Sequence, residues 1–297
     1  MLVIPYPQID PVLFAWGPIA IRWYALAYIA GLLIGWWVFA AMVKQASLWK
    51  NPPFNGKPPA TTDDAGDLVV WATMGVLLGG RIGYILFYAI ALCSVSPHEG
   101  FCAADKFPGS LVTQPWKIFE VWQGGMSFHG AAIGVILAIV WFCRRRKLPL
   151  FSVGDLVCAV QPIGQFFGRI ANFVNGELWG KPSHAPWAMV FPRAGAEPRH
   201  PSQLYEAALE GIALFVILQI GIRVFRWQER PGLTSAVFLI FYAVFRYIVE
   251  FFREPDAPFL AGVSMGQALS LAFLIGGFVV LYFAYRKPPE ASHERAV

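Results

Sequence analysis

The chain alternates long apolar segments with shorter polar ones, and the length of the apolar segments sets its class. A helix of about 20 residues is long enough to cross a hydrocarbon core of ~30 Å. Seven segments have such a length: 20–42, 67–91, 126–143, 153–174, 204–222, 233–252 and 264–285. We therefore expect an all-α, polytopic membrane protein with about seven transmembrane helices.

The composition supports this class. Of the 297 residues, 57% are hydrophobic and only 14% are charged, and the mean hydropathy is +0.54, outside the usual balance of soluble domains. The first span lacks the basic region and cleavage site of a secretory signal, so we expect it to be retained. We expect one transmembrane domain over residues 1–286, followed by a polar cytoplasmic tail at 287–297.

The net charge of +5 could indicate nucleic-acid binding, but its distribution indicates a membrane orientation instead. With the N-terminus outside, the inner segments carry 13 basic residues: Lys44, Lys50, Lys57, Arg144, Arg145, Arg146, Lys147, Arg223, Arg226, Arg230, Arg286, Lys287 and Arg295. The outer segments carry six: Lys106, Lys117, Lys181, Arg193, Arg199 and Arg253. The positive-inside rule therefore predicts the N-terminus outside and the C-terminus in the cytoplasm.

The outer segments have two further features. Segment 178–202 mixes aromatic, proline and basic residues, which predicts a small structured cap. Cys93 and Cys102 share the outer loop 92–125, and the sequence leaves open whether they form a disulfide. No cysteines show metal-ligand spacing with histidines, so we expect no metal and no cofactor.

Polar residues interrupt the apolar spans, and each one needs a partner or a purpose. An arginine at a helix centre costs about 2.5 to 3.5 kcal/mol on insertion scales. In the fourth span Arg169 and Asn172 are three residues apart and so share a helix face. Glu177 follows between Gly176 and Gly180, where the chain can turn. This region predicts the wall of a polar pocket.

The sixth span carries a polar stripe, and two more ionisable residues lie in the second and third spans. The stripe consists of Tyr242, Arg246, Glu250 and Arg253, at intervals that place them on one helix face. Arg246 and Glu250 can pair directly. Arg81 lies among glycines of the second span, and His129 lies at the outer start of the third.

The predicted orientation gives these residues a common depth. Arg169, Asn172, Arg246 and Glu250 fall in the outer halves of their helices, and His129 lies at the same level. Arginines with hydrogen-bonding partners at head-group depth suit a phospholipid phosphate. The alternative is that each charge belongs to a structural ion pair, and for Arg81 the two readings weigh equally. Ser127 beside His129 superficially suggests an intramembrane protease, but adjacency in sequence does not make a nucleophile–base pair.

Almost the whole chain resembles the prolipoprotein diacylglyceryl transferases of the bacterial cytoplasmic membrane. The resemblance lies in several motifs, of which the run from Asn172 to Gly180 is the most specific. The motifs are Arg22-Trp23-Tyr24, Gly79-Gly80-Arg81-Ile82-Gly83-Tyr84, Gly124-Gly125-Met126-Ser127-Phe128-His129-Gly130, residues 168–180, Arg199-His200-Pro201-Ser202-Gln203-Leu204-Tyr205-Glu206, and residues 245–253.

The resemblance implies that the diacylglyceryl group of phosphatidylglycerol is transferred to the cysteine thiol of a prolipoprotein lipobox. Such a transfer forms a thioether, releases glycerol phosphate and begins lipoprotein maturation, at the periplasmic leaflet of the inner membrane. The thiol needs a base, because its pKa in water is about 8.5, and His129 is the candidate. Arg169 and Arg246 would stabilise the departing phosphate. Tyr242 completes the expected catalytic set.

The residues expected to bind phosphatidylglycerol are Tyr24, Arg169, Asn172, Glu177, Gly180, Arg246 and Glu250. A lipid transporter or flippase would also place arginines at head-group depth. It would need alternating access, and the chain shows no internal repeat of the kind found in transporter halves. The sequence does not indicate how the two substrates enter.

Overall fold

The computed structural model describes residues 4–7, 9–17, 19–86, 115–120, 125–254 and 265–286. Six helices in this part of the chain are long and apolar enough to cross a membrane: Trp23–Lys44, Thr62–Tyr84, Leu150–Val174, Ser202–Arg223, Leu233–Glu250 and Gly266–Arg286. The expected class, a largely helical polytopic membrane protein, is thereby confirmed. A further helix, α4 (Phe128–Arg146), covers the third expected span but is not among those six. The count of seven stays a prediction.

The chain divides into two compact units, residues 62–150 and the remainder. In the first of these, α2 (Thr62–Tyr84) packs against α4 along glycines. Gly75, Gly79 and Gly83 of α2 repeat every four residues, as do Gly130 and Gly134 of α4. A Cβ built on Gly79 would lie 2.7 Å from the Gly134 Cα, and one on Gly75 would lie 2.6 Å from the Gly134 carbonyl oxygen. Small residues at this spacing let two backbones approach closely.

Polar contacts lie at both ends of α4. Arg146 near the C-terminus of α4 contacts Asp64, at 3.3 Å, and Asp67 in the first turns of α2. At the other end, the Ser127 side chain caps α4 by accepting from the Gly130 N–H at 3.2 Å. Ser127 therefore has a structural role of its own, as the N-cap of α4.

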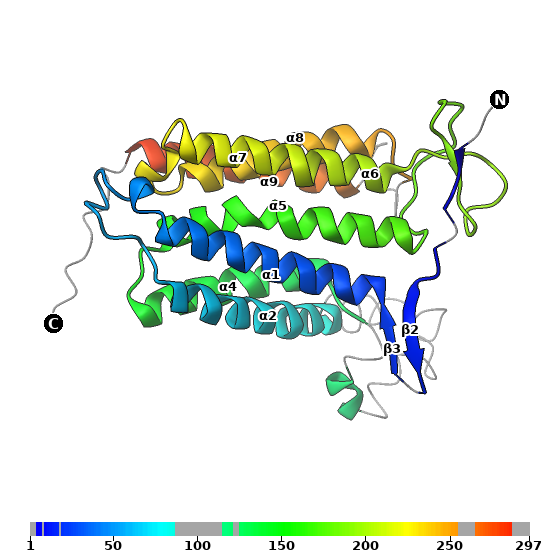
Figure 1. Ribbon diagram of the computed structural model, residues 1–297, viewed down its shortest axis with the longest axis horizontal. Coiled ribbons are helices and arrows are strands. Elements are labelled where there is room, and N and C mark those ends of the chain that lie inside the picture. The colour runs from blue at the N-terminus through cyan, green and yellow to red at the C-terminus, as the bar shows by residue number, and fades with distance from the viewer. Residues whose placement is uncertain are drawn as a thin grey trace. The chain divides into compact units, whose positions relative to one another are not determined.

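The second unit contains α1 (Trp23–Lys44), α5 (Leu150–Val174), a long helix from Ser202 to Arg223, α8 (Leu233–Glu250) and α9 (Met265–Arg286). The long helix consists of α6 (Ser202–Glu206), a π-helical segment η7 (Ala207–Ala213) and α7 (Leu214–Arg223). Figure 1 shows α7, α8 and α9 running side by side. Short 3₁₀ turns η1 (Ala46–Leu48) and η8 (Trp227–Glu229) follow α1 and α7.

Two small β elements precede α1. A hairpin of β2 (Val12–Trp16) and β3 (Ile19–Arg22) pairs antiparallel, with Trp16 opposite Ile19, and leads directly into α1. Before it, β1 (Ile4–Pro5) pairs in parallel with β4 (Met189–Val190). Figure 1 shows β1 beside the loop between α5 and α6. The N-terminal segment is thus joined to the segment expected to form the cap.

That segment, 178–202, is structured as expected. Antiparallel bridges join Pro182 to Arg199 and Met189 to Arg199 within it, and Gly180 to Arg253 just after α8. A hydrogen bond of 2.8 Å from the Lys181 N–H to the Phe252 carbonyl adds to the last connection. The segment is therefore attached to the end of α8. Cys93, Cys102 and the tail 287–297 lie outside the described residues.

The glycine contact between α2 and α4 leads to a stability prediction. We expect Gly79→Ala to lower the free energy of unfolding by about 1 to 3 kcal/mol, because the added methyl overpacks a backbone contact. Gly276→Ala in α9 is the matched control, since a Cβ there meets no atom within 4 Å. Thermal unfolding in detergent measures both. An equal effect of the two substitutions would contradict the proposed role of the glycine contact.

Candidate functional site

Arg169 and Arg246, two of the predicted site residues of the larger unit, meet at Glu206, a residue that the motifs alone did not single out. The Glu206 side chain is only 1% exposed, and two arginines from different helices contact its carboxylate. Arg169 Nε of α5 lies 2.5 Å from Oε2, and Arg246 Nη1 of α8 lies 3.1 Å from Oε1. Arg253 Nη1 lies 3.9 Å from Oε1. One carboxylate therefore joins α5, α6 and the end of α8.

Two more carboxylates complete this cluster. Glu250 Oε2 lies 2.9 Å from Arg246 Nη2, so the pairing expected from their spacing is confirmed. Glu210 is fully buried; its Oε2 accepts from Gln165 Nε2 at 2.8 Å and lies 3.9 Å from Arg169 Nη2. We call Arg169, Glu206, Glu210, Arg246, Glu250 and Arg253 the ionic cluster. The formal charges of its three arginines and three glutamates cancel, whereas the sequence predicted a positively charged site.

Local backbone features place these side chains together. Glu206 ends α6 and Glu210 lies in η7, and π-helical segments of this kind often occur at functional sites. Gly211 follows Glu210, and a Cβ on it would lie 2.7 Å from the Phe166 Cβ of α5. Only glycine permits this approach, which brings Glu210 within reach of Gln165 and Arg169.

The predicted wall from Asn172 to Glu177 adjoins Arg169. Asn172 Nδ2 donates to Glu177 Oε1 at 2.8 Å, and Arg169 Nη1 lies 3.5 Å from Asn172 Oδ1. Gln203 Nε2 donates to the Glu177 carbonyl at 2.6 Å. Gly176 has φ of 60°, which glycine adopts without strain, so the chain turns where the sequence predicted. Glu177 is thus fixed through both its side chain and its backbone.

Tyr6 closes the end of α5 from the N-terminal segment. Its hydroxyl lies 2.6 Å from the Phe173 carbonyl oxygen and 2.9 Å from that of Val174, both in the last turn of the helix. Its ring packs against Phe173 and Phe191. Burial raises the pKa of Tyr6, so the hydroxyl keeps the proton that it donates.

The two predicted tyrosines both lie near the ionic cluster. The Tyr24 hydroxyl, on α1, lies 3.2 Å from that of Tyr28 and within electrostatic range of Glu177 and Arg169. Tyr242 lies within electrostatic range of four members of the cluster, and its ring packs edge-on against Phe273 of α9 at 5.6 Å. Both hydroxyls can therefore contribute to the field at the arginines.

Gly180 has a packing role. Its N–H donates to the His200 carbonyl at 2.9 Å, and its own carbonyl accepts from Arg199 Nη1 at 3.2 Å. A Cβ on Gly180 would lie 2.8 Å from the His200 Cβ. Burial lowers the pKa of His200, whose Nδ1 lies 3.0 Å from the Tyr205 hydroxyl. Gly180 lets the cap backbone cross close to α8, and its predicted role in lipid binding stays a prediction.

Two predicted residues belong to the other unit. His129 is half-buried in the first turn of α4. Arg81 is buried in α2, where Nε donates to the Ile118 carbonyl at 2.8 Å and Nη1 to the Gly125 carbonyl at 3.1 Å. These contacts favour the structural reading of Arg81.

Glu206 and Glu210 were missed, although the sequence held a signal for them. Both lie inside the apolar segment 204–222, where an acidic side chain is as costly as the arginines that were noticed. Gln165 lies one helical turn before Arg169 and was missed for a different reason, since a glutamine carries no charge. Among the described residues, no three His, Cys, Asp or Glu side chains gather as metal ligands would.

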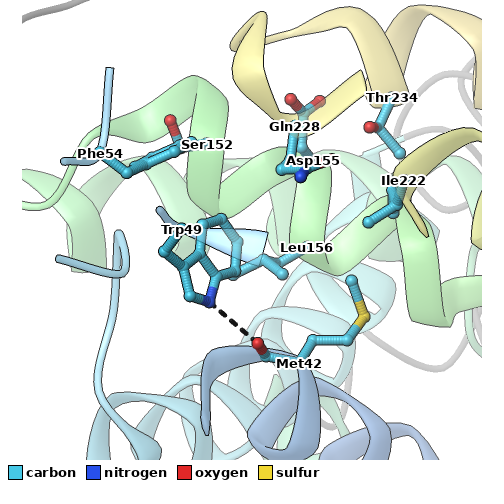
Figure 2. Close-up of a pocket in the computed structure, with 9 residues that line it drawn as sticks. All are labelled: Met42, Trp49, Phe54, Ser152, Asp155, Leu156, Ile222, Gln228 and Thr234. Atoms are coloured by element: carbon cyan, nitrogen blue, oxygen red, sulfur yellow. Dashed lines mark hydrogen bonds between the residues drawn. The ribbon is translucent and has the colours of Figure 1, made fainter. Parts of the chain in front are cut away.

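A small cavity lies near the other end of α5. Figure 2 shows its lining of Met42, Trp49, Phe54, Ser152, Asp155, Leu156, Ile222, Gln228 and Thr234. Its volume of about 10 Å³ admits a water-sized group but no lipid head group. The Asp155 carboxylate accepts from the Gly232 N–H at 2.7 Å and the Ser235 N–H at 2.8 Å, which caps α8. The cavity lies where α5 meets the start of α8. Asp155, in its lining, is about 21 Å along α5 from Arg169.

Comparison with known proteins identifies the family. A family model described as prolipoprotein diacylglyceryl transferase matches residues 11–283. The chain belongs to the prolipoprotein diacylglyceryl transferase family. The resemblance inferred from the motifs is confirmed, and membership makes the chain a membrane transferase of lipoprotein biosynthesis. The match covers the whole ionic cluster and both predicted tyrosines.

Curated relatives of this diacylglyceryl transferase family extend over nearly the full chain. A protein of Rhizobium meliloti (strain 1021) is 48% identical over 281 residues, 93% of this chain and 92% of the relative. One of Rhodopseudomonas palustris (strain ATCC BAA-98 / CGA009) is 49% identical over 289 residues, which are 96% of this chain and 93% of the relative. One of Rhodospirillum rubrum (strain ATCC 11170) is 49% identical over 296 residues, 98% of each chain. All three are named phosphatidylglycerol–prolipoprotein diacylglyceryl transferase.

The shared carboxylate leads to a second stability prediction. We expect Glu206→Ala to cost about 3 to 5 kcal/mol in unfolding free energy, because it removes the nearest counter-charge of Arg169 and one of the two close counter-charges of Arg246. Glu254→Ala is the matched control, since Glu254 pairs with Arg199 at 2.7 Å but is 48% exposed. We expect that change to cost less than about 1 kcal/mol. Thermal unfolding of both variants tests this difference, and a mild effect at Glu206 would refute the central role of its carboxylate.

Proposed function

We propose that this protein transfers the diacylglyceryl group of phosphatidylglycerol to the cysteine thiol of a prolipoprotein lipobox. The observation that carries this proposal is the partly buried pair Arg169 and Arg246, held by one buried carboxylate inside a chain that matches the family along its length. The names of the relatives supply the two substrates. Phosphatidylglycerol offers the anionic phosphate that paired guanidinium groups bind well.

The proposed reaction is a substitution at a glycerol carbon. The thiol sulfur forms a bond to the carbon of diacylglycerol that carries the phosphate, and the carbon–oxygen bond to the phosphate breaks. The thiol proton passes to His129, and glycerol phosphate leaves with the bonding electrons. The products are a thioether-linked lipid on the acceptor cysteine and free glycerol phosphate. In this proposal one group must remove a proton, and another must stabilise negative charge.

In this proposal Arg169 and Arg246 stabilise the negative charge on the departing phosphate. Their guanidinium groups are fixed before substrate arrives, so they stabilise charge on the phosphate with little reorganisation. Asn172 and Glu177 orient Arg169 and the head group, and Glu250 orients Arg246. The hydroxyls of Tyr24 and Tyr242 lie in the field of the same charges.

The membrane arrangement is part of the proposal. Seven spans, with α4 counted as the third, place the N-terminus outside and the C-terminus in the cytoplasm, as the basic residues favour. The ionic cluster then lies toward the periplasmic leaflet of the bacterial inner membrane. Residues 178–202 become a periplasmic cap on a single catalytic domain of residues 1–286. Acceptors that have crossed the membrane would meet the lipid on that side.

An assay with purified components tests the reaction. Protein, phosphatidylglycerol vesicles and a peptide carrying a lipobox cysteine should yield glycerol phosphate and a lipidated peptide in equal amounts. Mass spectrometry should show the thioether. Movement of labelled phosphatidylglycerol between leaflets without either product would favour a lipid transporter instead.

Arg246→Lys tests the geometry of the phosphate contact. Lysine keeps the positive charge but loses the planar pair of donors that now reaches Glu206 and Glu250. We expect turnover to fall about 10²-fold or more, in line with the loss of one fixed transition-state donor. Arg193→Lys on the exposed part of the cap is the matched control and should keep full activity. Wild-type rates for Arg246→Lys would indicate a structural salt bridge.

His129→Asn tests the proposed base. Because asparagine cannot accept the thiol proton, we expect turnover to fall by about 10² to 10⁴-fold while phosphatidylglycerol binding stays nearly unchanged. The exposed His184 gives the control variant His184→Asn, which should remain active. Initial rates and lipid binding measured on the same preparations separate the two effects. Full activity of His129→Asn would remove this residue from the chemistry.

A further inference from the structure

Glu210 differs from the other two carboxylates of the ionic cluster in how weakly it is paired. Arginine nitrogens approach Glu206 to 2.5 Å and Glu250 to 2.9 Å, whereas the ion pair of Glu210 spans 3.9 Å. Its hydrogen bond comes from an uncharged amide, that of Gln165. Its Oε1 has no hydrogen-bond partner among the described residues, although the side chain is fully buried. A buried carboxylate in this situation is poorly compensated.

Several elements surround Glu210 with charged or titratable groups. Glu206 lies four residues earlier on the same continuous helix, and like charges at that spacing repel. Glu210 therefore has one negative neighbour on its own helix and positive ones on two others. The groups that face it are Gln165 and Arg169 of α5, Glu206 of α6, and Tyr242 and Arg246 of α8.

Binding of an anion changes the charge of this cluster. Three arginines and three glutamates are formally neutral, and one phosphodiester adds a negative charge. Charges interact strongly where the effective dielectric constant is low, so an uncompensated charge at this depth is unfavourable. The imbalance disappears if one carboxylate gains a proton as the phosphate arrives.

We propose that Glu210 takes up one proton when the phosphate of phosphatidylglycerol binds Arg169 and Arg246, and so keeps the ionic cluster neutral. The step rests on the proposed function. The proton comes from a hydronium ion of the solvent, whose O–H bond breaks as an O–H bond forms on the Glu210 carboxylate; no other bond changes. When glycerol phosphate leaves, the proton returns to water. Glu210 is thus a positioning residue, which acts on the lipid through Arg169.

The contacts indicate Glu210 as the carboxylate that accepts the proton. Protonation of Glu206 would weaken its contacts with Arg169 and Arg246 together, and protonation of Glu250 would weaken a pair of 2.9 Å. Protonation of Glu210 weakens only the long contact to Arg169. A protonated Glu210 also keeps an acceptor for the Gln165 amide, because the proton can reside on Oε1.

The proposal is tested by measuring protons during lipid binding. Short-chain phosphatidylglycerol is titrated calorimetrically into detergent-solubilised protein in two buffers that differ in ionisation enthalpy. We expect the wild type to take up about one proton per lipid bound. Its Kd should then rise about tenfold per pH unit over the pH range in which this uptake occurs. Glu210→Gln, which resembles the protonated form, should bind the lipid with no proton uptake and a Kd that does not change with pH.

Three comparisons make the result specific. Glu254→Gln, an exposed glutamate outside the ionic cluster, should behave as the wild type. Diacylglycerol, which lacks the phosphate, should cause no proton uptake in any variant. Glu210→Asp keeps a titratable carboxyl and should restore the pH dependence. If Glu210→Gln does not fold, the wild type and Glu210→Asp still give the proton count that decides the matter.

The outcomes separate this inference from the proposed function. Lipid binding without proton uptake by the wild type, or unchanged uptake by Glu210→Gln, overturns the role of Glu210 and leaves the transfer reaction intact. Wild-type protein that yields no glycerol phosphate and no lipidated peptide overturns the proposed function itself. A Glu210→Gln variant that loses both lipid binding and heat stability, with no proton uptake in the wild type, identifies Glu210 as structural only.

Discussion

The sharing of one buried carboxylate by arginines of different helices is the constraint on which the site depends. Glu206 holds Arg169 of α5 and Arg246 of α8 at once. In a low-dielectric surrounding, neither arginine tolerates the loss of its counter-charge. The helices can therefore move apart only at a high electrostatic cost. The same contact that stabilises the fold also fixes the orientation of the groups proposed to bind phosphate.

Several other features support this arrangement from a distance. Gly211 permits the close approach of η7 to α5, and Gly180 permits the cap backbone to cross beside α8. Tyr6 reaches back from the N-terminal segment to the last carbonyls of α5, four and five residues after Arg169. The two glycines act by permitting close backbone contacts, and Tyr6 acts through its hydroxyl. Together they help to hold the long arginine side chains in place.

Sequence reasoning predicted the membrane class and singled out four of the six members of the ionic cluster, because apolar length and charge within apolar segments both leave strong patterns. The Arg246–Glu250 pair followed from helical spacing, and the turn at Gly176 from its glycine. The link through Glu206 joins residues 37 and 40 positions away, which helical periodicity does not encode. The neutrality of the ionic cluster was missed for the same reason. Two of its three glutamates, Glu206 and Glu210, lie on a different helix from the arginines that they contact, so the spacing of charges within each span did not indicate them.

The π-helical segment gives the long helix an unusual sensitivity to its own length. A π turn accommodates a surplus residue relative to an α-helix, and each residue of an α-helix corresponds to a rotation of about 100°. Loss of one residue between Ala207 and Ala213 would let the segment relax to α-helical form. The side chains of Glu206 and Leu214 could then no longer both point in their present directions around the helix axis. Natural variation in this family should therefore tolerate substitutions in the segment far better than single-residue deletions.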